Sequence, residues 1–195
     1  MLYMSLTLYN INDIYNKNVI VLGRKSSGKT DLLKDILDKI TFDIRLYVNF
    51  NSNHEIDSEL VIPSHSEKDF EQVYTTITEN KGTKILIVEN FNLFYSSYLQ
   101  DNKMLRLLEK NVDYSLTTIF VMNNFQLNFR NISTVFYKYI NLMFLSSIYF
   151  NVDNYVNNIF STNITEEFFE NLIEKYIDNK KYLVFKHDSI YYYCQ

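Results

Sequence analysis

The 195-residue chain contains only three glycines, one proline and one cysteine. These low counts restrict its domain organisation and the compartment in which we expect it. No Pro-, Gly- or Ser-rich linker divides the sequence, so we expect residues 1–195 to form a single domain. The lone Cys194 is typical of a reducing, intracellular compartment. The scarcity of glycine also makes the position of each one informative.

Long apolar runs and a strong positive charge are absent as well. The longest apolar stretch, residues 140–145, is far shorter than the roughly 20 residues that a bilayer-spanning helix needs. The N-terminus lacks the basic, then apolar, pattern of a secretory signal, so we expect an intracellular protein. A net charge of −4 gives no global attraction to nucleic acid, so contact with DNA would need a local basic patch.

The most informative segment that is present has the pattern G-x-x-x-x-G-K-[ST] and follows the apolar run of residues 19–22. It predicts a P-loop, in which glycines allow backbone amides to surround a polyphosphate. Two of the three glycines are in this segment. The predicted nucleotide-binding residues are Gly23, Arg24, Lys25, Ser26, Ser27, Gly28, Lys29 and Thr30. Lys29 is expected to contact the outer phosphates, and the Thr30 hydroxyl is expected to ligate Mg²⁺.

Alternating apolar runs predict an α/β fold with a mostly parallel central sheet flanked by helices and a C-terminal β-hairpin. We expect strands over residues 19–22, 44–48, 84–88, 116–122 and 140–145, and a hairpin from 182–185 and 190–193. Helices are expected over 31–40, 67–80, 98–110 and 166–178, the last with Thr165 as N-cap. The polar segment 49–66, which contains Pro63, is expected to be a surface loop.

A P-loop NTPase needs a carboxylate at the end of a neighbouring buried strand, and Glu89 follows such a strand. The next residue is Asn90, whose amide orients water but does not accept a proton. Two assignments stay open. Either Glu89 completes the Mg²⁺ shell and hydrolysis is slow, or Glu89 is the base and Mg²⁺ relies on Thr30, phosphates and water.

Asn123 and Asn124 end the strand predicted over residues 116–122. An amide at this place is suited to sensing the γ-phosphate. Asn residues also open turns through their own backbone hydrogen bonds, and the sequence does not decide between the two roles.

With these motifs in place, the chain resembles the genome-packaging ATPases of poxviruses and related large DNA viruses, in the FtsK/HerA class of P-loop ATPases. The resemblance is carried by the P-loop, the strand Ile85–Asn90, Asn123-Asn124, the element Phe129-Arg130-Asn131 and the C-terminal hairpin. It implies a RecA/FtsK-like P-loop NTPase fold, ATP and Mg²⁺ as cofactors, and a homo-oligomeric ring around double-stranded DNA. Arg130 is then either an arginine finger or a surface ion-pair partner.

The resemblance also implies a motor that drives viral DNA into a capsid, in the host cytoplasm or viral factory or associated with the virion. Two alternatives remain: a switch or scaffold that binds nucleotide with weak or lost hydrolysis, favoured by Asn90, and a small nucleoside or nucleotide kinase. The scarcity of arginines is unlike the Arg-rich lid of such kinases. No Asn-Lys-x-Asp element supports a GTPase.

Overall fold

The computed structural model describes residues 6–49, 60–63, 67–89, 102–123, 134–147, 156–157, 159–160, 164–177, 181–187 and 189–195. Within these ranges, one sheet has the strand order β1-β9-β8-β7-β2-β6-β5-β3-β4. The strands are β1 (Thr7–Leu8), β2 (Asn18–Leu22), β3 (Ile44–Asn49), β4 (Leu60–Pro63), β5 (Lys84–Glu89), β6 (Leu116–Met122), β7 (Leu142–Leu145), β8 (Lys181–Lys186) and β9 (Ser189–Cys194).

The sheet is mostly parallel. Strands β7, β2, β6, β5, β3 and β4 are successive parallel neighbours, so their carboxyl ends share one edge of the sheet. The hairpin of β8 and β9 adds antiparallel pairing next to β7, and the short β1 lies parallel to β9. This arrangement confirms the predicted α/β fold with its C-terminal hairpin.

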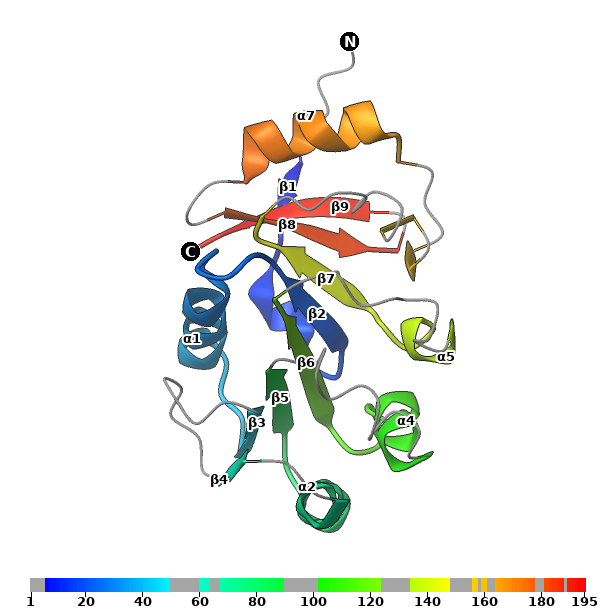
Figure 1. Ribbon diagram of the computed structural model, residues 1–195. Helices are drawn as coiled ribbons and strands as arrows, with labels where there is room; N and C mark the ends of the chain where they lie inside the picture. Colours follow the sequence, from blue (N-terminus) through cyan, green and yellow to red (C-terminus); the bar gives the residue numbers. More distant parts are fainter. Residues whose placement is uncertain are drawn as a thin grey trace.

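Helices cover both faces of the sheet (Figure 1). The helical elements are η1 (Ile11–Ile14), α1 (Lys29–Lys39), α2 (Glu67–Glu79), α4 (Asn102–Glu109), α5 (Thr134–Tyr137) and α7 (Glu166–Tyr176). Apolar residues of α1 and η1 pack against one face, and those of α2, α4, α5 and α7 pack against the other. None of the described helices has both the length and the apolar character needed to cross a bilayer.

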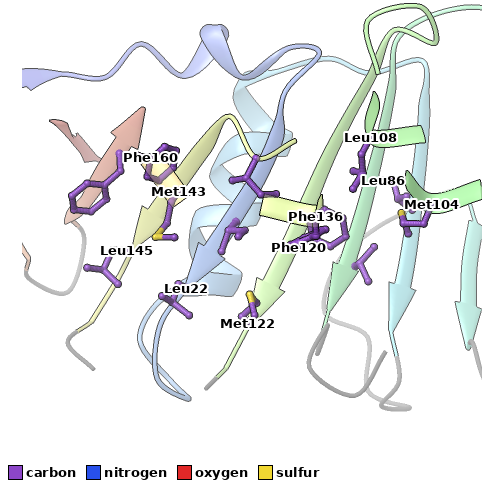
Figure 2. Close-up of a cluster of buried hydrophobic side chains, with 14 of the residues drawn as sticks. Leu22, Leu86, Met104, Leu108, Phe120, Met122, Phe136, Met143, Leu145 and Phe160 are labelled. Carbon is purple, nitrogen blue, oxygen red and sulfur yellow. The ribbon is translucent and has the colours of Figure 1, made fainter. Parts of the chain in front are cut away.

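Strand β2 lies in the middle of the sheet, and both faces of the sheet are covered at this position. All five of its residues are buried, and they alternate between the two cores: Ile20 and Leu22 face α4 and α5, whereas Val19 and Val21 face α1. Figure 2 shows Leu22 in the first of these cores, with Met122, Met143 and Leu145 from the neighbouring strands. Burying each apolar side chain of this kind stabilises the fold by about 1.5–3 kcal/mol.

Two details qualify the predicted elements. Residues 60–63 form strand β4 at the sheet edge, within the segment predicted to be a surface loop. Pro63 ends this strand, which is consistent with the rule that proline, lacking an N–H, is tolerated at sheet edges. The helix predicted over 98–110 is described only from Asn102 onward, and its earlier residues lie outside the described ranges.

The predicted N-cap of α7 is confirmed. The backbone at Thr165 is extended, and its hydroxyl accepts a hydrogen bond from the Phe168 amide at 3.3 Å. Phe169, Leu172 and Ile173 then turn toward the sheet and pack in the same core as α2 and α4.

Candidate nucleotide-binding site

The P-loop leaves the sheet at the carboxyl end of β2, between β6 and β7. Leu22 is in register with Met122 on one side and Leu145 on the other. The Gly23 amide donates to the Met122 carbonyl at 3.3 Å, so pairing with β6 extends to the first residue of the loop. In open α/β sheets, ligands bind beyond this edge of the strands.

The loop backbone uses two left-handed residues. Gly28 has φ +85° and Ser26 has φ +62°. Gly28 is the N-cap of α1, no side chain caps this end of the helix, and the Gly28 carbonyl accepts from the Leu32 amide at 2.9 Å. Glycine adopts this conformation without steric cost, whereas Ser26 retains local strain of about 1–2 kcal/mol. Because no side chain caps this helix end, the first amides of α1 are suited to binding an anion.

Gly23 is needed for a different reason, which is space. A Cβ at this position would overlap the hydroxyl oxygens of both Ser146 and Ser27. Any larger residue would therefore displace the two serine hydroxyls that meet beside Gly23.

We expect Gly23→Ala to lower the free energy of unfolding by about 1–3 kcal/mol and to weaken nucleotide binding, because relief of this overlap breaks the contact between the Ser27 and Ser146 hydroxyls. Thermal unfolding and calorimetric titration with ATP measure the two effects. Gly82→Ala is the matched control: Gly82 has φ +96°, its added Cβ would meet the Asp43 side chain, and it precedes β5 at the opposite sheet edge. The control should lose stability without losing affinity. Equal loss of affinity in both variants would contradict the prediction.

Lys29 is buried, with 6% of its surface exposed. Its ammonium donates to the carbonyls of Gly23 at 2.9 Å and Arg24 at 2.5 Å, so the cation lies within the loop. Burial lowers the pKa of this amine to about 8, and the negative charge of Glu89 opposes that shift. An ammonium has three protons, so with two of them given to these carbonyls one remains for an anionic ligand.

Glu89 ends β5, in register with Val121 of β6. Strand β6 therefore lies between β5 and the P-loop strand β2. The effect of Glu89 on the Lys29 pKa shows that the tertiary structure brings the predicted acid within electrostatic range of the predicted lysine. Asn90 lies outside the described residues.

The other predicted site residues are placed as follows. Thr30 is the second residue of α1 and is half-buried. Arg24 and Lys25 are exposed. Asn123 is exposed directly after β6, whose last carbonyl bonds to Gly23. Asn124 and Arg130 lie outside the described residues.

Three residues that the sequence analysis did not identify contact the loop. Ser146 and Ser147 follow β7: the Ser146 hydroxyl is 2.6 Å from that of Ser27, and the Ser147 hydroxyl accepts from the Arg24 amide at 2.7 Å. Tyr182 of β8 donates to the Gly28 carbonyl at 2.9 Å. Ser146 and Ser147 could have been suspected from the sequence, because they directly follow a predicted strand. No local pattern indicates that Tyr182 contacts the loop.

These residues fit a polyphosphate with Mg²⁺. The loop supplies a buried ammonium, an uncapped helix end and a glycine whose missing Cβ keeps the loop close to β7. Thr30 and Glu89 supply oxygen donors, the type that Mg²⁺ prefers. Among the described residues, no group of three or more His, Cys, Asp and Glu side chains forms a metal site of its own. Any Mg²⁺ held here would thus depend on the phosphates for part of its ligand set.

No protein-family model matches the chain. A search of curated proteins also finds no match. These two comparisons therefore assign the chain to no family. Its similarity to known proteins is seen in the comparison with solved structures.

Solved structures match over nearly the whole chain. The genome packaging NTPase B204 from Sulfolobus turreted icosahedral virus 2, in complex with ATPγS, matches with a TM-score of 0.60 and 18% identity, over 90% of this chain and 95% of B204. EssC (ATPases 2 and 3) from Geobacillus thermodenitrificans matches with a TM-score of 0.61 and 8% identity, over 93% of this chain and 40% of that protein.

The pCW3 conjugation coupling protein TcpA, in its monomer form with ATPγS, matches with a TM-score of 0.56 and 12% identity, over 92% of this chain and 60% of TcpA. At these identities, the similarity shows a shared fold. The chain therefore shares the α/β fold of these solved structures, with a mostly parallel sheet and a C-terminal antiparallel hairpin.

Proposed function

We propose that the chain is a Mg²⁺-dependent P-loop ATPase that moves double-stranded viral DNA into a capsid. The observation that carries the nucleotide-binding part is the position of Lys29, buried within the P-loop and within electrostatic range of Glu89. The packaging part is supported by the sequence resemblance and by the fold shared with B204, a genome packaging NTPase.

Within this proposal, each residue has a defined role. The loop amides and Lys29 bind the phosphates, and Thr30 and Glu89 hold the cation shell. The bound Mg²⁺ supplies charge neutralisation at the transferring phosphoryl group. In the second assignment, Glu89 accepts the proton of the attacking water instead. Asn123 senses the γ-phosphate from the end of β6, with Asn90 orienting water and Arg130 acting as the arginine finger.

We further propose that residues 1–195 act as one domain in a homo-oligomeric ring, with DNA in its pore and a capsid protein as partner, in the host cytoplasm or viral factory. The support for this part is the sequence resemblance, together with the fold shared with B204, a genome packaging NTPase.

The test is the ATP hydrolysis rate with and without double-stranded DNA, together with sizing in ATPγS. DNA stimulation and a ring-sized species are the expected results. Nucleotide binding without turnover would instead support a switch or scaffold, the role that the amide of Asn90 favours. Phosphate transfer to a nucleoside with no effect of DNA would overturn the motor proposal.

The affinity for ATP should depend on pH through Lys29. Phosphate oxygens favour its protonated form, and its pKa before binding is about 8. We therefore expect an affinity that is level below this pKa and falls by up to about tenfold per pH unit above it, because binding then requires uptake of a proton. Calorimetric titration at several pH values, in buffers of different ionisation enthalpy, measures both the affinity and the proton uptake. A level affinity well above pH 8 would contradict the prediction.

A further inference from the structure

The residue after β7 contacts the P-loop at two levels. The Ser146 amide donates to the Leu22 carbonyl at 2.9 Å, which extends the pairing of β7 with β2. The Ser146 hydroxyl also donates to the Leu22 carbonyl, at 3.1 Å, and lies 2.6 Å from the Ser27 hydroxyl. Ser146 is buried, with 6% of its surface exposed.

The direction of the hydroxyl pair follows from proton counting. A serine hydroxyl carries one proton, and a carbonyl oxygen only accepts. Because the Ser146 proton is given to Leu22, the proton between the two hydroxyls belongs to Ser27, which donates to Ser146. Ser27 is thus anchored to the end of β7 through a relay that ends on the P-loop strand.

We propose that Ser146 is a positioning residue for the phosphate-binding loop. Ser27 immediately precedes Gly28 and Lys29, so anchoring its side chain sets the direction of the loop backbone at the point where φ is +85° and α1 begins. Gly23 leaves the space in which the two hydroxyls meet. The inference rests on the proposed nucleotide-binding role and extends it to a residue far away in sequence.

Two further hydrogen bonds also hold the loop against β7 and β8. Ser147 accepts from the Arg24 amide at 2.7 Å, and Tyr182 of β8 donates to the Gly28 carbonyl at 2.9 Å. The paired strands β7 and β8 therefore hold the loop at its start, near its apex and at the first turn of α1. The Ser27–Ser146 bond is the side-chain contact nearest the middle of the loop.

The experiment measures dissociation constants of the purified full chain for ATP and for inorganic tripolyphosphate, which reports on the loop without a base or sugar. Ser146→Ala should weaken both ligands by about 5–10-fold, the loss expected for one hydrogen bond. Ser27→Ala should weaken them equally, and the double variant should be no weaker than either single one, because the two hydroxyls act as one unit. Ser146→Thr keeps the hydroxyl and should restore affinity.

Thr118→Val is the matched control for removal of a buried hydroxyl. Thr118 is fully buried on β6 and pairs with Asn18, at the end of β2 opposite the P-loop. Thermal unfolding without ligand shows whether each variant is folded at the assay temperature. If Ser146→Ala does not fold, Ser27→Ala at its half-buried position and Ser146→Thr still test the pair: the first should weaken both ligands by about 5–10-fold, and the second should bind them like the wild type.

The two proposals fail in different ways. If the wild-type chain binds neither ATP nor tripolyphosphate, the nucleotide-binding proposal is overturned. If the wild type binds both and folded Ser146→Ala or Ser27→Ala binds within twofold of it, only the positioning role is overturned. A lower unfolding temperature with unchanged affinity would show that Ser146 serves stability alone.

Discussion

Replacing Lys29 with methionine should abolish measurable ATP binding, a loss of at least about 100-fold, and should at the same time stabilise the fold near neutral pH. The loss of affinity follows because the ammonium is the only buried cation in the described part of the loop and a charge-assisted bond to phosphate is worth about 1.5–3 kcal/mol before the cost of an unpaired anion is added.

The gain in stability follows from the pKa of Lys29, which is about 8 in the fold against an ordinary value of 10.5 for a lysine in water. Folding therefore disfavours the charged form. This cost is fully present below pH 8, decreases as the pH rises, and is absent above the unfolded pKa. Methionine avoids the cost but loses the bonds to Gly23 and Arg24, so we expect a net gain of about 1–2 kcal/mol at pH 7 and none above pH 10.5.

Calorimetric titration with ATP and thermal unfolding at the two pH values measure these opposite effects. Lys34→Met, on the exposed side of the same helix, is the control and should change neither quantity appreciably. Retained ATP affinity in Lys29→Met would remove the P-loop from the proposed function. Lower stability of this variant at pH 7 would show that the hydrogen bonds outweigh the desolvation of the charge.

Replacing Glu89 with glutamine should slow single-turnover ATP hydrolysis by about 100-fold or more, because the amide neither accepts a proton nor carries charge to the cation shell. The affinity of this variant for ATP, measured with and without Mg²⁺, then distinguishes the two possible roles of Glu89. If Glu89 is the base, ATP affinity with Mg²⁺ remains within a few-fold of wild type. If it completes the cation shell, affinity falls with Mg²⁺ and is unchanged without it.

The same variant gives an independent check through Lys29. The Glu89 charge raises the Lys29 pKa against the effect of burial. Its removal should therefore move the pH at which ATP affinity begins to fall to a value below 8. Glu79→Gln, at the exposed end of α2, is the control. An unchanged hydrolysis rate in Glu89→Gln would exclude Glu89 from the mechanism.

Much of the local structure is predictable from the sequence because it depends on short-range patterns. The strand over 116–122 and the start of α7 at Thr165 match their predicted positions, since continuous apolar runs and capping residues act within a few residues. The prediction of a surface loop over 49–66 was wrong at residues 60–63, which form the edge strand β4. The polar neighbours of this strand and Pro63 are typical of a loop, and its pairing with β3 cannot be read from the adjacent residues.

The sequence alone determined the P-loop pattern, the α/β class and the order of the central strands and their helices, because each of these depends on residue type and spacing along the chain. The tertiary structure decided which strands are neighbours. It placed β6 between β2 and β5, brought Glu89 within range of Lys29, and set Ser146, Ser147 and Tyr182 against the loop. These contacts join residues more than 30 positions apart, and their pairing is fixed by burial of the whole sheet between two helical layers rather than by any local pattern.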